Sequence, residues 1–504
     1  MARASIVAEL TAAPSPDGRE LCAIAHAAEW LEVRADLVGD IDPNWVRNFF
    51  PGKLLYSLRR NSAGGAFEGS GAERVARLLD ASQKYDLVEL EAEGDLRVDL
   101  LAGIAVEKRM LSWYGQPMDY SKLVSHFHRL SSIQSRLYKM VVEGRRSEDA
   151  LGSLCLMKSF GRSDLIAFAS GKSGFWSRLV ALQFGAPIIF GSADRSWTSD
   201  GAPPVLQLIE DYGLPSFSPV NKIYGIVGNP VIHSLSPRIH NAGYRAFEHP
   251  ALFVPFQTES FVDFWREIVT GGTLESLSLP IRGLTVSSPY KEVAMRVAHA
   301  SSQMSRHIGA ANVLVRNNGQ WEADTTDSEG AMLALRNKGF SVRGKKAAVV
   351  GCGGAGRAIA AALYEAGADV TLVNRGVERG HLAARLLGLP FITLSSFSLD
   401  GFSILVNATH LGRDDNEMPF ELNGLSKDRM VIDLVYRSTP TPLIANALAL
   451  GHAAISGQEI LLIQVCNQFR KMTGRDMPTD VAHEVLGLKR KTSARTQNVG
   501  FETK

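Results

Sequence analysis

The chain has 504 residues, of which 45% are hydrophobic and 21% charged, and these shares predict a globular protein with room for roughly two to four domains. The formal net charge is +2, so neither nucleic acid nor an anionic membrane surface is expected as the main partner. The four cysteines lie far apart and lack the spacing of metal ligands, so we expect reduced thiols and no metal site.

The apolar runs of the sequence predict neither a membrane span nor a signal peptide. No apolar run approaches the roughly 20 residues that span a bilayer, and the first ten residues lack the apolar region of a signal peptide. We therefore expect a cytoplasmic protein. The last segment, 489–504, is polar and basic without apolar periodicity, and we expect it to be disordered.

Short apolar runs alternate with helix-like stretches over nearly the whole chain, which predicts an α/β fold with parallel sheets. In residues 1–215 several strand candidates are followed by polar residues, as at the active-site face of a (β/α)8 barrel. We therefore predict such a barrel. Its candidate strands are 5–10, 31–34, 54–57, 87–90, 123–125, 137–142, 165–169 and 187–190.

Charged residues within these candidate strands predict carbonyl chemistry. Lys139 lies in an otherwise apolar strand, and burial lowers the pKa of a lysine so that its neutral amine can attack a carbonyl carbon. Glu32 and Arg34 share one face of another strand, and Arg59 directly follows a third. His128 is expected near a strand end, where an imidazole can move protons.

These residues resemble the type I 3-dehydroquinate dehydratases, which are (β/α)8 enzymes that form a Schiff base. The resemblance rests on the Glu32-Val33-Arg34 motif, on Arg59, on the segment 139–149 and on the pair Ser177-Arg178. It implies that Lys139 forms an imine with a ketone, and that Glu32, Arg34, Arg59 and Arg178 bind substrate.

The chain departs from this family pattern at three places, one of which is the stretch from His128 to Lys139, which is too short for the helix that the family has there. The histidine of the family corresponds to His128, with His126 as a competing candidate. The late lid segment of the family contains a glutamine, whereas this chain has Ala202-Pro203-Pro204-Val205. Whether the barrel is active therefore stays open.

A Pro-rich stretch, 213–219, is the expected linker to the second half of the chain. The strand 222–227 restarts the α/β pattern and is followed by Ser234 and Ser236. In an extended segment both hydroxyls point to the same side and can donate to one carboxylate. The alternative is an ordinary serine turn ahead of a helix that begins near Pro237.

A Gly-rich loop between a strand and a helix predicts a dinucleotide site. The strand 347–350 leads into the loop and residues 357–366 favour a helix; the loop residues are Gly351, Gly353, Gly354, Ala355 and Gly356. The next strand, 370–373, ends in Asn374-Arg375. An arginine here can pair with a ribose 2′-phosphate and no carboxylate repels that phosphate, which favours NADP.

The second half resembles the shikimate dehydrogenases, whose motifs occur in family order at 228–241, 283–291, 309–314, 324–330, 407–412, 433–436 and 457–464. The resemblance implies a substrate-binding domain, 222–330, completed by 457–488, and a Rossmann-type NADP domain, 331–456. It implies that Lys291 and Asp327 polarise a ketone and relay a proton. The implied substrate ligands are Ser234, Ser236, Thr285, Ser287, Asn312, Tyr436 and Gln464, and the implied further cofactor contacts are Asn407, Thr409 and Gly457.

The two resemblances together predict consecutive reactions on one chain. Dehydration of 3-dehydroquinate yields 3-dehydroshikimate, which the second half reduces to shikimate with NADPH. The substitutions Thr285, Ser287 and Thr325 leave the choice between shikimate and quinate open. One alternative is a dehydrogenase with an inactive barrel. A metabolite-sensing regulator is disfavoured because both lysines are present and no DNA-binding segment is visible.

Overall fold

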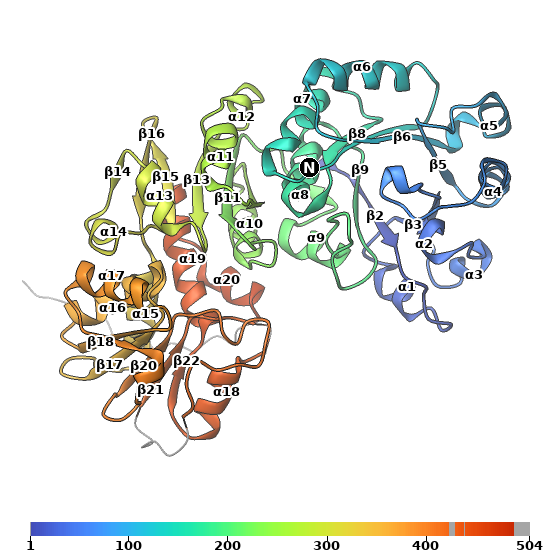
Figure 1. Ribbon diagram of the computed structural model, residues 1–504. Helices are drawn as coiled ribbons and strands as arrows, with labels where there is room; N and C mark the ends of the chain where they lie inside the picture. The colour runs from blue at the N-terminus through green and yellow to red at the C-terminus, as the bar shows by residue number, and fades with distance from the viewer. Residues whose placement is uncertain (1, 423–428, 438, 488–504) are drawn as a thin grey trace, which may run out of the picture. The chain divides into compact units, whose positions relative to one another are not determined.

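The computed structural model describes residues 2–422, 429–437 and 439–487, and the chain divides into two compact units (Figure 1). Unit 1 comprises Met1–Tyr244, Glu248–Ser302 and Ala310–Asp324, and unit 2 comprises Arg245–Phe247, Gln303–Gly309 and Thr325–Lys504. Within the described residues, no helix is both long and apolar enough to cross a membrane. The predicted tail, 489–504, lies outside the described residues.

The first part of unit 1 is a nearly closed barrel of eight parallel strands, as predicted (Figure 1). The strands are β2 (Ser5–Leu10), β3 (Trp30–Arg34), β4 (Lys53–Ser57), β5 (Leu87–Glu91), β6 (Arg109–Gly115), β7 (Leu137–Val142), β8 (Leu165–Ala169) and β9 (Ile188–Ser192). Neighbours pair in the order β8-β7-β6-β5-β4-β3-β2-β9. The helices around them are α1 (Arg19–Ile24), α2 (Ala35–Val38), α3 (Pro43–Arg47), α4 (Gly71–Lys84), α5 (Val98–Gly103), α6 (Tyr120–Ser131), α7 (Leu151–Phe160), α8 (Gly171–Ala181) and α9 (Val205–Tyr212).

The barrel interior is built in layers, because alternate residues of each strand point inward. One layer is apolar and consists of Val7, Trp30, Leu55, Leu87, Met110, Leu137, Ile166 and Ile188. Two residues further along, the inward positions of six strands are polar: Glu9, Glu32, Ser57, Glu89, Ser112 and Lys139, all buried. Phe168 of β8 and Phe190 of β9 fill the seam between the terminal strands, with ring centroids 6.5 Å apart. The barrel therefore carries a charged layer above an apolar plug.

One predicted strand is wrong and one true strand was missed. Residues 123–125 belong to helix α6, whose buried residues Leu123, Phe127 and Leu130 recur at helical spacing on the face toward the barrel. The true fifth strand is β6, which follows the short helix α5. Because β6 and not segment 123–125 is the fifth strand, different side chains reach the barrel interior.

The rest of unit 1 is a six-stranded mixed sheet in the order β12-β11-β13-β15-β16-β14. Its strands are β11 (Lys222–Gly228), β12 (Ala251–Gln257), β13 (Ile281–Val286), β14 (Ala300–Ser301), β15 (Val313–Asn317) and β16 (Gln320–Asp324). The accompanying helices are α10 (Ser236–Ala246), α11 (Phe261–Phe264), α12 (Thr273–Ser276) and α13 (Lys291–Val297). The expected linker contains β10 (Ser216–Phe217), which pairs antiparallel with β1 (Ala2–Arg3).

Helix α8 joins the barrel to this sheet. It contacts both β8 and β12, and its residues from Gly174 to Ala181 are all buried. The Trp176 ring lies 5.2 Å from the Phe256 ring, and its indole N–H donates to the carbonyl of Ser147 at 3.1 Å. A helix buried all round belongs to the core of a larger unit.

Unit 2 is a Rossmann-type sheet of six parallel strands in the order β19-β18-β17-β20-β21-β22. The strands are β17 (Lys346–Val350), β18 (Asp369–Asn374), β19 (Phe391–Thr393), β20 (Ile404–Asn407), β21 (Met430–Asp433) and β22 (Ala453–Ile455). The helices are α14 (Gln303–Ile308), α15 (Asp327–Asn337), α16 (Gly354–Glu365), α17 (Val377–Leu387), α18 (Pro442–Ala449), α19 (Gly457–Thr473) and α20 (Thr479–Val485). The strand–loop–helix around residue 351 is formed as predicted.

Trp176→Ala should lower the free energy of unfolding by about 3–5 kcal/mol, because it removes a large side chain from the core of unit 1. Urea denaturation followed by circular dichroism measures this change. The control is Leu206→Ala, whose side chain is 40% exposed and should cost less than about 1 kcal/mol. Equal effects of the two variants would contradict this packing.

Candidate active sites

Lys139 lies inside the barrel and its side chain is 2% exposed. Its Nζ is 3.5 Å from Oε1 of Glu89 and 4.0 Å from the centroid of the Phe190 ring. Burial, together with the nearby Arg59 guanidinium, lowers the pKa of Lys139 against the opposing pull of the carboxylates. The protein thus holds a lysine whose neutral form is accessible at a lower pH than usual.

Two buried arginines connect the interior carboxylates. Arg59 places Nη2 2.7 Å from Oε1 of Glu32 and Nε 3.4 Å from Oε2 of Glu89. Arg178 places Nη1 3.7 Å from Oε1 of Glu9, and its guanidinium lies 4.3 Å from the Phe168 ring centroid. The interior charges are therefore compensated in pairs.

Asp200 comes from the loop 193–204 that follows β9 and lies near both arginines. Its Oδ2 is 3.5 Å from Nη1 of Arg59 and 3.8 Å from Nη2 of Arg178. Burial acts to raise the pKa of Asp200, but Arg178 and Arg59 outweigh it and lower that pKa. The two guanidinium groups thus flank a carboxylate, a group that arginine binds well.

Several polar atoms around this site lack a hydrogen-bond partner among the described residues. They include Oε2 of Glu9, Oε2 of Glu32 and Nε of Arg178. Burial and the nearby Asp200 and Glu32 carboxylates raise the pKa of Glu9 to about 8. Because buried polar groups are normally satisfied, this cluster is suited to a polar ligand.

The predicted histidines do not lie with Lys139. His128 is exposed on α6, with its ring 5.3 Å from the Phe160 ring. His126 is on the same helix, 2.9 Å from a nitrogen of Arg129, and its ring packs on Trp113. The structure contradicts the placement of His128 near a strand end, because α6 covers the outside of the barrel.

The other predicted residues of the barrel separate into two groups. Glu32, Arg59 and Arg178 are joined to Lys139 through the contacts above. Arg34 forms a two-point ion pair with Asp36, at 2.9 and 2.8 Å, and its charge also helps to lower the pKa of Asp200. Their roles toward a substrate stay predictions.

Sequence reasoning missed four buried or half-buried groups of this site: Glu9, Glu89, Tyr114 and Asp200. Glu89 carried the same signal as Lys139, a charged residue within an apolar strand. Tyr114 was hidden because β6 was not predicted. Asp200 lies on a loop, where sequence periodicity carries no information.

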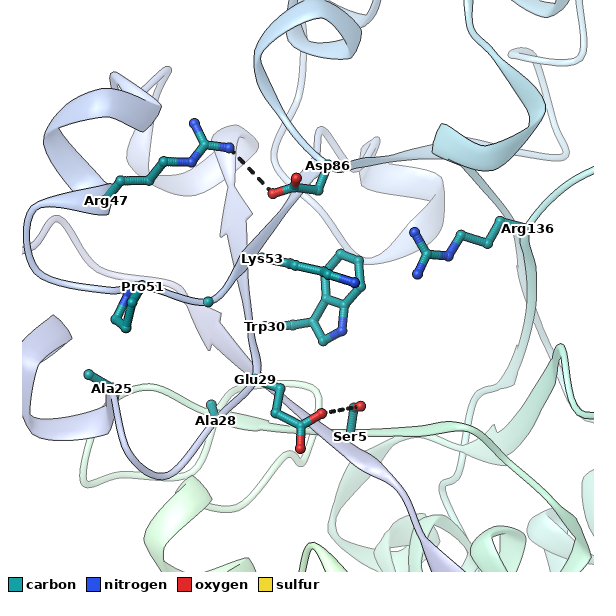
Figure 2. A pocket seen from close by; sticks show the side chains of 11 residues that line it. Ser5, Ala25, Ala28, Glu29, Trp30, Arg47, Pro51, Lys53, Asp86 and Arg136 are labelled. Carbon is teal, nitrogen blue, oxygen red and sulfur yellow. Dashed lines mark hydrogen bonds and ion pairs between the residues drawn. The ribbon is translucent and has the colours of Figure 1, made fainter.

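Figure 2 shows a second pocket, at the amino-terminal ends of the barrel strands. Lys53 and Arg136 lie over the Trp30 ring, at 5.4 and 5.3 Å from its centroid. Arg47 pairs with Asp86 at 3.3 Å. In such barrels this end contributes stability, whereas the chemistry belongs to the opposite end.

Of the two predicted serines of the second half, Ser236 begins helix α10 and Ser234 precedes it by two residues. The backbone N–H of Ser236 donates to Oγ of Ser234 at 3.2 Å, so the serine turn weighed as an alternative is present. Both side chains are buried. The turn is compatible with ligand binding, because Ser234 accepts this bond and keeps its own O–H donor.

The remaining predicted residues of unit 1 gather beyond the ends of β11 and β13. The N–H of Val286 donates to the carbonyl of Asn312 at 2.7 Å. The N–H of Ala311 donates to the carbonyl of Lys291 at 2.8 Å. The N–H of Ser287 donates to the carbonyl of Val227 at 2.9 Å. Thr285, one residue before the end of β13, is buried. These bonds hold Thr285, Ser287, Lys291 and Asn312 in one region.

Asp327 and Gln464 are neighbours in unit 2. Nε2 of Gln464 donates to Oδ1 of Asp327 at 3.0 Å, and Asp327 is buried at the start of α15. Tyr436 is half-buried beyond the end of β21. The structure thus brings together two of the residues that the sequence assigned to one substrate.

The Gly-rich loop of unit 2 leaves space for a pyrophosphate. Gly351 has φ +112°, and a Cβ there would lie 2.6 Å from the carbonyl oxygen of Ala408. A Cβ at Gly356 would lie 1.9 Å from the carbonyl oxygen of Gly351, whereas one at Gly353 would meet nothing within 4 Å. Helix α16 begins at Gly354, so its free N–H groups and positive dipole end face that space.

Hydrogen bonds and close packing hold the residues around this loop, and an exposed arginine follows β18. Asn374 accepts from the N–H of Cys352 at 3.1 Å, which places the end of β18 beside the loop. The next residue, Arg375, is exposed. Asn407 accepts from Thr409 at 2.7 Å and donates to Asp433 at 2.9 Å. Gly457 packs so closely that a Cβ would lie 2.3 Å from the carbonyl oxygen of Val435.

Comparisons with known proteins agree with this arrangement. A family model for the "Shikimate dehydrogenase substrate binding domain" matches residues 226–314. The Shikimate dehydrogenase (NADP(+)) of Methanothrix thermoacetophila is 35% identical over 263 residues, which cover 52% of this chain and 94% of that protein. The chain belongs to the shikimate dehydrogenase family.

The part in front of this shikimate dehydrogenase has relatives of its own. A family model for "Type I 3-dehydroquinase" matches residues 11–218. A bifunctional 3-dehydroquinate dehydratase/shikimate dehydrogenase of Arabidopsis thaliana is 26% identical over 494 residues, which cover 91% of this chain and 80% of that protein. A solved shikimate dehydrogenase of Aquifex aeolicus covers 53% of this chain and 97% of its own, with a TM-score of 0.49 and 29% identity.

The pKa of Lys139 should lie below the ordinary lysine value of about 10.4, because burial and Arg59 disfavour its ammonium form. Nuclear magnetic resonance of ¹³C-labelled lysines measures it, with the signal assigned by its loss in Lys139→Met. Lys84 serves as the control, since its bond to Asp80 raises the pKa of Lys84. A Lys139 pKa at or above the ordinary value would contradict the electrostatic argument.

Proposed function

We propose that the chain catalyses two consecutive reactions, dehydration of 3-dehydroquinate to 3-dehydroshikimate in the barrel and its NADPH-dependent reduction to shikimate in the second half. The observation that carries the first reaction is Lys139, buried beside Glu89 in a layer that also holds Arg59 and Arg178. The family membership of the chain and the coverage of a bifunctional relative support the pairing of the two.

In the barrel, the neutral amine of Lys139 attacks the ketone carbon. The carbonyl oxygen leaves as water and a protonated C=N bond forms, which acidifies the adjacent C–H. Loss of that proton and of the neighbouring hydroxyl creates the C=C bond of the product. Hydrolysis of the imine then returns Lys139.

The arginines orient the substrate for this step. We assign Arg59 and Arg178 to the substrate carboxylate, which would displace Asp200 from between them. Glu32 fixes Arg59 through the 2.7 Å ion pair, and Arg34, at the end of the same strand as Glu32, is paired with Asp36. Binding therefore places the substrate carboxylate between two arginines that already compensate the carboxylate of Asp200.

In the second half, the assigned roles follow the dehydrogenase motifs. Ser234 and Ser236 hold the substrate carboxylate, and its hydroxyls are addressed by Thr285, Ser287, Asn312, Tyr436 and Gln464. The ketone oxygen takes up a proton and becomes a hydroxyl. Lys291 and Asp327 donate that proton and then replace it.

We assign the cofactor site to the Gly-rich loop and to the residues that surround it. The assigned contacts are Gly351, Gly353, Gly354, Ala355, Gly356, Asn374, Arg375, Asn407, Thr409 and Gly457. The loop would take the pyrophosphate, and Arg375 would pair with the 2′-phosphate that distinguishes NADP. When bound, NADPH supplies the hydride.

Two observations favour a second candidate, a shikimate dehydrogenase with an inactive barrel. The histidines of the barrel segment lie away from Lys139, and the segment that resembles the family's lid reads Ala202-Pro203-Pro204-Val205, without its glutamine. Trapping of the imine separates the two candidates.

Borohydride should reduce the imine and leave a stable adduct on Lys139 when 3-dehydroquinate is present. Peptide mass spectrometry measures the site of the adduct. Lys139→Ala should form none and lose dehydration, while its reduction of 3-dehydroshikimate stays unchanged. Lys172→Ala, from a lysine on α8, is the matched control and should behave as wild type. Absence of any adduct in wild type would support the inactive barrel.

Arg375→Asp should raise KM for NADPH at least about tenfold, because it replaces a phosphate-pairing cation with a repelling carboxylate. Steady-state reduction of 3-dehydroshikimate measures this effect, and KM for NADH should rise much less. Arg379→Asp, in the following helix, is the comparison variant. An unchanged KM for NADPH in Arg375→Asp would remove this residue from the cofactor site.

A further inference from the structure

The dehydration step requires both a base for the C–H proton and an acid for the departing hydroxyl. A histidine commonly fills such roles, but the three histidines of residues 1–215 are His26, His126 and His128. His26 and His128 are exposed, and His126 lies on the outer helix α6. The proton chemistry of the barrel must therefore use other residues.

Tyr114 is placed beside Lys139 by the register of β6. Strands β6 and β7 pair so that Ser112 lies opposite Lys139, and Tyr114, two residues further, points to the same interior. Nζ of Lys139 is 5.5 Å from the centroid of the Tyr114 ring, and the Arg59 guanidinium is 5.3 Å from it. The phenol thus lies in the charged layer of the barrel.

Glu89 links this phenol to the lysine. The hydroxyl of Tyr114 donates to Oε1 of Glu89 at 2.6 Å, and the same oxygen is 3.5 Å from Nζ of Lys139. Glu89 itself is 1% exposed. One oxygen of the Glu89 carboxylate therefore contacts both the phenol of Tyr114 and the amine of Lys139.

We propose that Glu89 and Tyr114 form the proton relay of the barrel, with Glu89 as the base and Tyr114 as the acid. The proposal rests on the dehydratase function proposed above.

The relay balances in atoms and protons. Glu89 accepts the proton from the carbon next to the C=N bond, and those electrons form the new C=C bond. The carbon–oxygen bond of the neighbouring hydroxyl breaks while Tyr114 donates its proton, so water leaves. The proton on Glu89 then passes along the 2.6 Å hydrogen bond to the phenolate and restores both groups.

The electrostatics assign the two roles in this direction. Burial acts to raise the pKa of Glu89, but Lys139 and Arg59 outweigh it and lower that pKa, so the carboxylate is ionised. Burial raises the pKa of Tyr114, and Glu89 and Glu32 raise it further despite Arg59, so the phenol stays protonated. Two neighbouring groups whose pKa values are shifted in opposite directions are the usual arrangement of a base and an acid.

Glu9 is the rival acid, since its pKa is raised to about 8. Its carboxyl group contacts Arg178, at 3.7 Å, on the opposite side of the interior from β6. Glu89 and Tyr114 are preferred because Glu89 approaches Lys139 itself.

The test is Tyr114→Phe, which removes only the proton donor. Dehydration of 3-dehydroquinate should fall by about 10²–10⁴-fold, while borohydride still traps the imine. In deuterium oxide the variant should still exchange the C–H proton of bound 3-dehydroquinate, because Glu89 remains. Glu89→Gln should lose both exchange and elimination.

The matched control is Tyr56→Phe, because the Tyr56 hydroxyl also donates to a carboxylate, that of Asp40, at 2.6 Å. It should keep dehydration within about threefold of wild type, and its midpoint of thermal unfolding provides the comparison for stability. Imine trapping in Tyr114→Phe shows that the barrel is folded.

Three outcomes would overturn the relay and leave the proposed function standing. They are a Tyr114→Phe variant within about threefold of wild type, loss of proton exchange in that variant, and abolition of elimination by Glu9→Gln alone. If wild type itself neither dehydrates nor traps an imine, the dehydratase function fails instead.

Discussion

The chemistry proposed for the barrel depends on the ion pair of Lys139 with Glu89. An ammonium group in an apolar barrel is costly unless a carboxylate compensates it, and removing one partner of such a pair typically costs about 3–5 kcal/mol. The structure places Glu89 3.5 Å from the lysine and Arg59 next to Glu89. This compensation is partial, so the pKa of Lys139 is still lowered and its nucleophilic form remains accessible.

The same balance accounts for the other charged groups of the barrel. Arg59 and Arg178 offset Glu9, Glu32 and Asp200 at distances between 2.7 and 3.8 Å. A substrate that brings a carboxylate and a ketone can replace Asp200 without changing the total charge. The site is thus prepared for an anion before it binds, and little reorganisation is needed during the reaction.

The sequence predicted the parts of the fold in which one residue type contrasts with its surroundings. A lysine within an apolar strand and glycines between a strand and a helix gave Lys139 and the loop at Gly351. The prediction of a strand at 123–125 was wrong because three residues cannot distinguish the 2-residue period of a strand from the 3.6-residue period of a helix. That error hid β6 and with it Tyr114, and it placed His128 at a strand end. Contacts such as those of Asp200 depend on a loop conformation that no periodicity encodes.

The second half was more predictable, because its motifs occur at fixed places along strands and helices. Even there, the hydrogen bond between Gln464 and Asp327 joins residues 137 positions apart and was visible only in the structure. The serine turn at Ser234 also shows that a structural role and a binding role can reside in one segment.

The central claim, that both active sites function in sequence on one chain, is tested most directly by supplying 3-dehydroquinate and NADPH together and following the consumption of NADPH. Our account predicts that wild type consumes one NADPH for each 3-dehydroquinate and releases shikimate, without any added dehydratase. Consumption of NADPH with 3-dehydroshikimate but not with 3-dehydroquinate would contradict it.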